Sequence, residues 1–270
     1  MSNAHTDNLI ADKLEQRAAP GRKDAYLASL AKALQVLEAF DIHQPALTMA
    51  AIAEIVGLDR AGARRALLTL KHMGYVETDG KLFRLTPRVL SLGYRYLGGL
   101  FFWRSAQAVM EQLADELNET VSIGVLDAAD VIFVWRVPGR RLLTFDPRIG
   151  TRVPAYVSSI GYVMLAALRD EELADYMSAL KLERLTQHTV RTKAEFMAHL
   201  KAVRSQGWSF VARQQEENFF GLAVPISEPN GRVVAALHVG GLYDAQAERR
   251  AKEEMLPRLR VAALKLSGKD

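Results

Sequence analysis

Apolar residues recur at helical spacing in the N-terminal third of the chain. One such segment runs from Leu27 to about Phe40, and a shorter one covers 49–56 and ends at Gly57. Asp59 can cap a third helix. The apolar stripe of that helix consists of Ala63, Ala66, Leu67 and Leu70. Two short helices joined by a tight turn with a glycine predict a helix-turn-helix.

A hairpin signal follows this helical pair. Residues 75–78 and 81–85 flank an Asp-Gly pair at 79–80, a dipeptide typical of tight β-turns. Helices followed by such a hairpin predict a winged helix-turn-helix. A Thr-Pro pair at 86–87 then begins another helix, which the Gly-Gly pair at 98–99 interrupts.

The rest of the chain alternates between strand and helix patterns. Strands are expected near 121–125, 131–137, 208–214, 222–226 and 233–239, and helices near 159–168, 170–180 and 192–206, with one more at the C-terminus. This mixture favours an α+β second domain. The predicted organisation is a flexible arm at 1–24, a winged helix at 25–86, a linker helix at 87–100 and the α+β domain at 101–268.

Composition narrows the class of protein. The chain has 270 residues and no cysteine, which removes disulfides, thiolate metal sites and cysteine nucleophiles, and suits a cytoplasmic location. No apolar run approaches 18 residues, so no membrane span is expected. We therefore expect a two-domain globular protein with no membrane partner.

Positive charge is concentrated near the N-terminus. Residues 1–104 contain 14 Lys and Arg against 10 Asp and Glu, which accounts for the whole net charge of +4. Within 60–95, eight Lys and Arg stand against two acidic residues. A basic domain joined to a neutral one indicates that the first domain alone binds a polyanion such as double-stranded DNA.

The third helix has the layout of a recognition helix. Arg60, Arg64 and Lys71 fall within a stripe of about 40° beside the apolar arc, given 100° per residue. A solvated surface would show similar charges, but the basic hairpin next to the helix favours DNA contact. The expected DNA-binding residues are Arg60, Arg64, Arg65, Leu68, Lys71, Lys81 and Arg84.

Enzyme chemistry has little support in the sequence. The six histidines lack the spacing of a metal site, and neither a G-x-S-x-G elbow nor a P-loop is present. We expect no catalytic residue, metal or cofactor. Two alternatives stay open at this point: an enzyme with an appended DNA anchor, and an architectural DNA-binding protein without a ligand.

Several strings resemble those of IclR-family regulators. In the winged helix these are LTMAAIA at 47–53, GLDR at 57–60, ARRALLTL at 63–70 and GYV at 74–76, and LTPRVLSLGY at 85–94 is similar to the family's linker helix. In the second domain they are RVP at 136–138, GTRVPAY at 150–156, SSIG at 158–161, QGW at 206–208 and AVPI at 223–226. The resemblance covers 25–268 and is greatest to the branch that regulates protocatechuate and 4-hydroxybenzoate catabolism, the β-ketoadipate pathway.

This resemblance implies a GAF-like effector domain, control of nearby catabolic genes, and a homodimer or dimer of dimers on a DNA operator. The apolar residues around the interrupted linker helix fit a dimer contact. They are Leu90, Leu92, Leu97, Phe101 and Phe102.

The effector implied by that branch is a small aromatic carboxylate, with a small aliphatic or other organic acid as the alternative. The chain departs from the family pattern at QQEENFFG (214–221), at Tyr162, where arginine is usual, and at His238 in the late strand. His238 could donate a hydrogen bond to the effector, or it could be a structural histidine. The candidate effector residues are Phe133, Trp135, Arg152, Tyr156, Ser158, Ser159, Gly161, Phe220, His238 and Gly240. Among them we expect the two serines and Arg152 to hold the carboxylate and the aromatic residues to form a wall.

Overall fold

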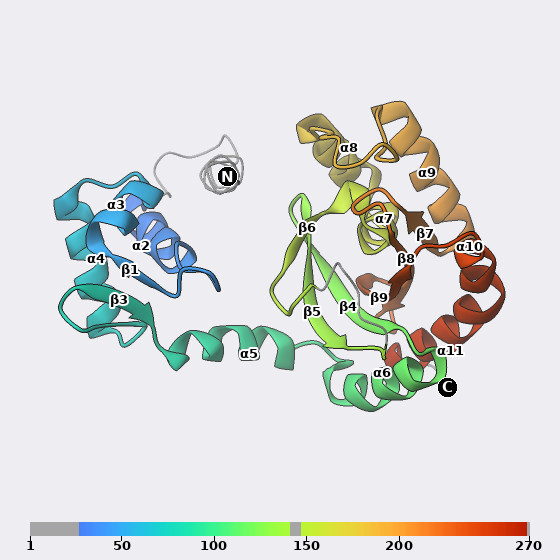
Figure 1. Cartoon of the computed structure of the whole chain (residues 1–270), viewed down its shortest axis with the longest axis horizontal. Helices are drawn as coiled ribbons and strands as arrows, with labels where there is room; N and C mark the ends of the chain where they lie inside the picture. Colours follow the sequence, from blue (N-terminus) through green and yellow to red (C-terminus); the bar gives the residue numbers. More distant parts are fainter. Residues whose placement is uncertain (1–26, 141–146, 269–270) are drawn as a thin grey trace. The chain divides into compact units, whose positions relative to one another are not determined.

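The computed structural model describes residues 27–140 and 147–268. The expected arm at 1–24 therefore lies outside the described residues. The chain divides into two compact units, the first ending at Gly98 and the second beginning at Gly99. Each unit is described by itself (Figure 1).

The first unit is a winged helix-turn-helix, as predicted. Its elements are α2 (Ala28–Glu38), β1 (Ala46–Thr48), α3 (Met49–Val56), α4 (Arg60–His72), β2 (Val76–Thr78), β3 (Leu82–Leu85), the 3₁₀ turn η2 (Pro87–Val89) and α5 (Leu90–Gly98). The three strands form an antiparallel sheet in the order β1-β3-β2. The three-residue strand β1 had no counterpart in the sequence reading because it is too short to show alternation.

Local caps fix the ends of the two helices of the helix-turn-helix. The Thr48 side chain accepts a hydrogen bond from Ala51 N at the start of α3, and Gly57 ends that helix with a left-handed φ of 63°. Asp59 Oδ1 accepts from Gly62 N at 2.6 Å and so caps α4. These caps place the turn between the helices, and apolar side chains of α2, α3 and α4 meet in one core beneath it.

The second unit contains one curved antiparallel sheet with helices on both faces (Figure 1). Its strands are β4 (Thr120–Asp127), β5 (Asp130–Val137), β6 (Arg152–Pro154), β7 (Ser209–Ala212), β8 (Phe219–Ser227) and β9 (Val233–Leu242), in the order β6-β5-β4-β9-β8-β7. Its helices are α6 (Trp103–Leu117), α7 (Ser159–Ala166), α8 (Asp170–Ala179), α9 (Lys193–Gln206), α10 (Ala247–Arg250) and α11 (Leu256–Leu266), with a 3₁₀ turn at Ala155–Val157 and a π-helical turn at Ala251–Met255. The α+β class is confirmed.

Helix α7 covers one face of this sheet, and α6 and α11 pack against each other and against the opposite face. His238 on β9 pairs with Ser122 on β4 and with Ala223 on β8, so these three side chains project toward α7. Leu237 and Val239 alternate with them and point to the other face. The face under α7 therefore carries the polar side chains of the central strands.

A β-bulge between β4 and β5 places two aromatic residues of β5 on opposite faces of the sheet. Ile123 pairs with Trp135, but the next residue, Gly124, pairs with Phe133, so that Val134 is an extra residue on β5. Phe133 thus lies on the α7 face, whereas Trp135 lies on the α6 face. Strict alternation would have placed both rings on the same side.

A membrane-crossing segment is not among the elements of either unit: within 27–140 and 147–268, every helix is too short or too polar to span a bilayer.

Candidate DNA-binding surface and effector cavity

Helix α4 buries one face and exposes the other. Ala63, Leu67 and Leu70 are buried in the core of the first unit. The predicted DNA-binding residues of this helix are all exposed: Arg60, Arg64, Arg65, Leu68 and Lys71. Within the part of the chain that the structure describes, no ion pair or side-chain hydrogen bond joins its four cations to another residue. Their charge is available to an external anion.

A groove of about 440 Å³ runs between α4, the start of α3 and the tip of the hairpin. Arg64 and Leu68 line it from α4, and Lys81 lines it from the hairpin. Thr48 and Ala50 line it from the start of α3, a contribution that the sequence reading missed. Backbone N–H groups at a helix start favour an anion, so this groove combines two cations with a favourable helix end.

Arg84 differs from the other predicted cations. Its Nη1 lies 3.1 Å from Asp79 Oδ2 at the tip of the hairpin. Backbone hydrogen bonds from Leu82 and Lys81, together with Arg84, lower the pKa of Asp79 to about 2. Asp79 is therefore ionised at neutral pH, and the charge of Arg84 is balanced within the hairpin.

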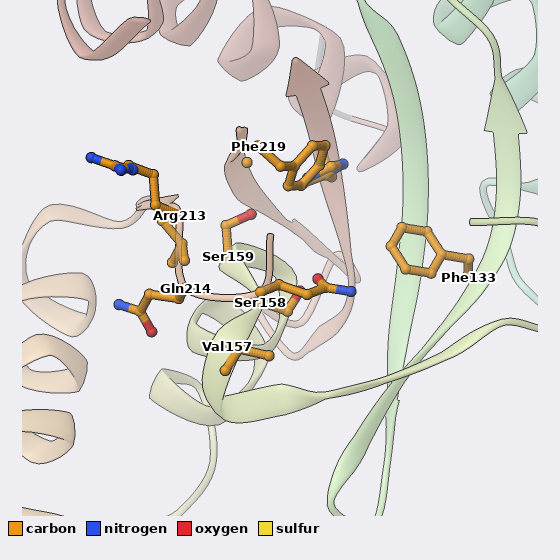
Figure 2. Close-up of a pocket in the computed structure, with 11 residues that line it drawn as sticks. Phe133, Val157, Ser158, Ser159, Arg213, Gln214 and Phe219 are labelled. Atoms are coloured by element: carbon orange, nitrogen blue, oxygen red, sulfur yellow. The ribbon is translucent and has the colours of Figure 1, made fainter. Parts of the chain in front are cut away.

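The second unit contains a small cavity between α7 and the sheet (Figure 2). Figure 2 shows Phe133 at one side of it and Ser159 and Phe219 at the other. The described residues that line it are Phe133, Val157, Ser158, Ser159, Val211, Arg213, Gln214, Gln215, Phe219, Gly221 and His238. Its volume is about 10 Å³, which is the space of roughly one water molecule.

Some of the residues that line this cavity have buried polar atoms without a partner. Ser159 Oγ and His238 Nδ1 are buried and make no hydrogen bond to any described residue. Burial lowers the pKa of His238 to about 3, so its imidazole is neutral at pH 7. A neutral imidazole offers one donor and one acceptor. Because buried polar groups are nearly always paired, these two atoms can pair with a polar group that enters the cavity.

Two glycines keep space open beside these atoms. A Cβ at Gly221 would lie 2.6 Å from His238 Nε2 and 2.7 Å from Ser159 Oγ. A Cβ at Gly240 would lie 2.7 Å from the Phe219 ring and 2.9 Å from His238 Cε1. Any larger residue at either position would displace the polar side chains that line the cavity.

The structure brings part of the predicted effector set together. Phe133, Ser158, Ser159 and His238 line the cavity, and Gly240 lies next to the His238 ring without lining the cavity itself. The Phe133 and His238 rings lie edge to face with centroids 6.2 Å apart. The structural basis for this grouping is that α7 begins beside the polar face of strands β4, β9 and β8.

Trp135 and Phe220 were wrongly expected in this wall. Trp135 contacts Trp103 of α6 edge to face, at 4.1 Å between ring centroids, on the far side of the sheet. Phe220 alternates with the lining residue Gly221 along β8 and therefore also points to the far face. It is completely buried and packs against Phe210.

Arg152, Tyr156 and Gly161 were also predicted to bind the effector, but they are not among the residues that line the cavity. Arg152 binds Asp127 at 2.7 Å and Asp130 at 3.2 Å at the sheet edge, so its charge is already balanced away from the cavity. The Tyr156 hydroxyl donates to Glu183 O and accepts from Glu183 N.

Gly161 has a packing role. A Cβ there would overlap the backbone of Ala155, so its absence lets the 3₁₀ turn at Ala155–Val157 lie against α7.

The sequence reading missed the loop between β7 and β8, residues 213–218. Arg213, Gln214 and Gln215 line the cavity from this loop. Gln214 lies at the start of the string already noted as a departure from the family pattern, and that departure was the available signal. Nothing in the local spacing indicated that the loop would fold over the start of α7.

Comparison with known proteins settles the family. A model of the bacterial transcriptional regulator IclR C-terminal domain matches residues 94–268, and one of the IclR helix-turn-helix domain matches 29–80. The chain belongs to the IclR family. It is therefore a DNA-binding transcriptional regulator and not an enzyme.

Two curated relatives are named as regulators of the Pca regulon and of p-hydroxybenzoate hydroxylase. The chain is 35% identical to the Pca regulon regulatory protein of Pseudomonas putida, over 83% of this chain and 79% of that protein. It is 34% identical to the p-hydroxybenzoate hydroxylase transcriptional activator of Acinetobacter baylyi, over 91% of this chain and 92% of the relative.

Among solved structures, an IclR homologue from Microbacterium hydrocarbonoxydans complexed with 4-hydroxybenzoate is similar, with a TM-score of 0.78 and 25% identity. That match covers 89% of this chain and 98% of the homologue.

Proposed function

We propose that this regulator binds a small aromatic hydroxy acid, of the 4-hydroxybenzoate or protocatechuate class, in the cavity beside α7. The relatives named for Pca and p-hydroxybenzoate regulation and the neighbour that holds 4-hydroxybenzoate support this effector class. The observation that carries the proposal is the pair of buried, unpartnered atoms, Ser159 Oγ and His238 Nδ1, in one aromatic-lined cavity.

Each end of such a ligand has a matching group in the cavity. The start of α7 presents backbone N–H groups, and the N-cap residue Ser158 makes no side-chain cap, so hydroxyls and amides there suit a carboxylate. The neutral imidazole of His238 suits a phenolic hydroxyl, for which it can donate or accept. Phe133 and Phe219 contribute apolar surface for the ring.

Calorimetric titration tests this assignment. 4-Hydroxybenzoate and protocatechuate should bind, and glyoxylate and pyruvate should bind weakly or not at all. Ser159→Ala and His238→Ala should each lose about 1–3 kcal/mol of binding free energy, the cost of a lost hydrogen bond in a buried site. Ser178→Ala, on exposed α8, is the matched control. Binding of the aliphatic acids alone, or undiminished aromatic binding by both variants, would contradict the assignment.

We also propose that the chain acts as a symmetric homo-oligomer on its operator. Helix α5 supports this, because none of its residues is buried and it exposes Leu90 (70%), Tyr94 (69%) and Leu92 (48%). A nine-residue helix is marginal alone in water, so a second copy packed on this surface would stabilise it. Phe101 is exposed as well, but Phe102 is 1% exposed in the core of the second unit and is removed from the predicted contact.

Light scattering tests the oligomer. The wild-type chain should have at least twice the mass of one chain at micromolar concentration, and Leu90→Asp with Tyr94→Asp should shift it toward the monomer. A monomeric wild type would contradict the proposal. We further propose that the protein controls a regulon of aromatic-acid catabolic genes, which transcript profiling with and without 4-hydroxybenzoate would test. We also propose a cytoplasmic location.

A further inference from the structure

Arg213 is the one charged side chain among the described residues that line the cavity. His238, the other titratable residue there, is neutral at pH 7 because of its burial. A carboxylate effector that enters this low-dielectric space needs a positive partner, since an unpaired buried charge is costly. Arg213 is therefore the cation that the described cavity wall can supply.

Arg213 is already occupied. Its Nη2 lies 3.1 Å from Glu217 Oε2, and its Nε donates to Glu217 O at 3.1 Å. The guanidinium also lies over the ring of Tyr243, 5.4 Å from the centroid. Figure 2 shows the guanidinium directed away from Ser159 and Phe133. In this arrangement Glu217 holds the charge of Arg213 outside the cavity.

The loop that carries both residues is held in a conformation with a local cost. Arg213 has a φ of 64°, a left-handed value that residues other than glycine seldom adopt. Hydrogen bonds from Thr186 Oγ1 to Arg213 O and from Thr189 Oγ1 to Gln214 O fix the backbone there.

A cavity of about 10 Å³ must enlarge before a benzene ring can enter. Apart from the half-buried Phe219, the lining residues of the sheet are buried, whereas the loop at 213–218 contains exposed residues. The enlargement therefore falls on this loop.

We propose that Glu217 is an internal competitor of the effector: the effector carboxylate displaces the Glu217 carboxylate from Arg213 and thereby moves the 213–218 loop. This inference rests on the proposed function. The exchange conserves the number of ion pairs, because one carboxylate replaces another on the same guanidinium. Effector affinity is then a difference between two ion pairs, and loop movement is coupled to binding by the same contact.

The substitution Glu217→Gln tests the competition. It removes the negative charge and keeps the size of the side chain. We expect 4-hydroxybenzoate to bind about two- to fivefold more tightly, the range set by a partly exposed ion pair. Glu228→Gln is the matched control, because Glu228 forms the same i,i+4 pair with Arg232 and lies outside the cavity lining. This control should leave the affinity unchanged.

A double-mutant cycle and a neutral ligand identify the partner. Arg213→Gln should weaken 4-hydroxybenzoate binding at least about tenfold, since a charge-assisted hydrogen bond is lost. In that background Glu217→Gln should give no gain. 4-Hydroxybenzamide, which has no carboxylate, should bind the wild type and Glu217→Gln equally. If Arg213→Gln does not fold, Arg213→Lys, which keeps the charge but loses the two-pronged contact, replaces it in the cycle.

Unchanged or weaker 4-hydroxybenzoate binding by Glu217→Gln would overturn the inference. So would a gain that persists without Arg213 or that extends to the amide. A wild-type chain that binds none of the aromatic acids would instead overturn the proposed function itself, so the two failures are distinguishable.

Discussion

Arg84 Nη1 and Asp79 Oδ2 lie 3.1 Å apart at the tip of the β2–β3 hairpin. This contact balances one of the two hairpin cations that the sequence assigned to DNA binding. Lys81, the other, lines the groove beside α4 and forms no ion pair with any residue in the described ranges. The hairpin is therefore asymmetric: one cation is available to a phosphate, and the other is held by a neighbouring carboxylate.

This asymmetry predicts different effects of two substitutions. Lys81→Ala should weaken operator binding across all DNA sequences and reduce the slope of log affinity against log salt by about 1, the loss of one phosphate contact. Arg84→Ala should have a smaller effect, because its charge is already compensated. Gel-shift titration at two salt concentrations measures both. An effect of Arg84→Ala equal to or larger than that of Lys81→Ala would show that the ion pair opens on DNA.

Removal of the Asp79 carboxylate, which competes with DNA phosphates for Arg84, should have the opposite effect on DNA affinity. Asp79 is ionised at neutral pH, since its pKa is lowered to about 2 by backbone hydrogen bonds from Leu82 and Lys81 and by Arg84. Asp79→Asn should strengthen DNA binding, because it removes a negative charge near the phosphates and frees Arg84. The expected gain is modest for an exposed pair. Weaker binding by Asp79→Asn at unchanged thermal stability would contradict this prediction.

Arg64 should make the base or phosphate contact at the centre of the interface. It lines the groove between α4 and the hairpin, whereas Arg65 on the same helix does not. Arg64→Ala should cost about 1–3 kcal/mol on a specific operator if it contacts a base. Arg65→Ala, an equal change in charge, should cost less. Competition with a mutated operator separates a base contact from a phosphate contact, and equal losses for the two variants would contradict the groove geometry.

The helices and the hairpin of the winged helix could be predicted from the sequence because their signals are local. Asp59 caps α4, Gly57 ends α3 and the Asp-Gly pair turns the hairpin, all through neighbouring residues. The effector cavity was predicted less completely because its geometry is non-local. An extra residue at Val134 reverses the face of Trp135, and alternation along one strand cannot reveal a bulge that depends on its partner strand.

Non-local geometry also explains why the charged residue of the cavity was not predicted from the sequence. Arg152 was chosen because it lies close to the serines in sequence, but at the sheet edge it binds Asp127 and Asp130. Arg213 lies more than fifty residues from those serines and reaches the cavity only because β7 and β8 bring the 213–218 loop over α7. Proximity in the chain was the wrong guide to proximity in space.

The two faces of the sheet predict opposite outcomes for two phenylalanines. Phe133→Leu should weaken 4-hydroxybenzoate binding about two- to tenfold, because it removes a ring from the cavity wall. Phe220→Leu, on the far face, should lower the free energy of unfolding and leave the affinity unchanged. Calorimetry together with chemical unfolding measures both quantities. A loss of affinity confined to Phe220→Leu would mean that the register of β8 has been misread.

His238 predicts a pH dependence of stability in the effector domain. Its pKa is lowered by burial to about 3, whereas an unfolded histidine titrates near 6.5. Between these values the unfolded chain binds a proton that the native chain does not, so the free energy of unfolding falls as the pH falls. The resulting decrease in the free energy of unfolding is close to zero at pH 7 and about 2 kcal/mol at pH 5.

The three tryptophans allow this contribution to be measured in the effector domain alone. Trp103, Trp135 and Trp208 all belong to the second unit, so their fluorescence reports its unfolding and not that of the winged helix. Urea titrations at pH 7, 6 and 5 should show a steeper loss for the wild type than for His238→Gln, whose side chain cannot take up a proton. His43→Gln, in the first unit, is the control. Parallel pH profiles for the wild type and His238→Gln would mean that the imidazole is protonated or solvated in the native state, and a neutral imidazole could then no longer be assigned to the effector hydroxyl.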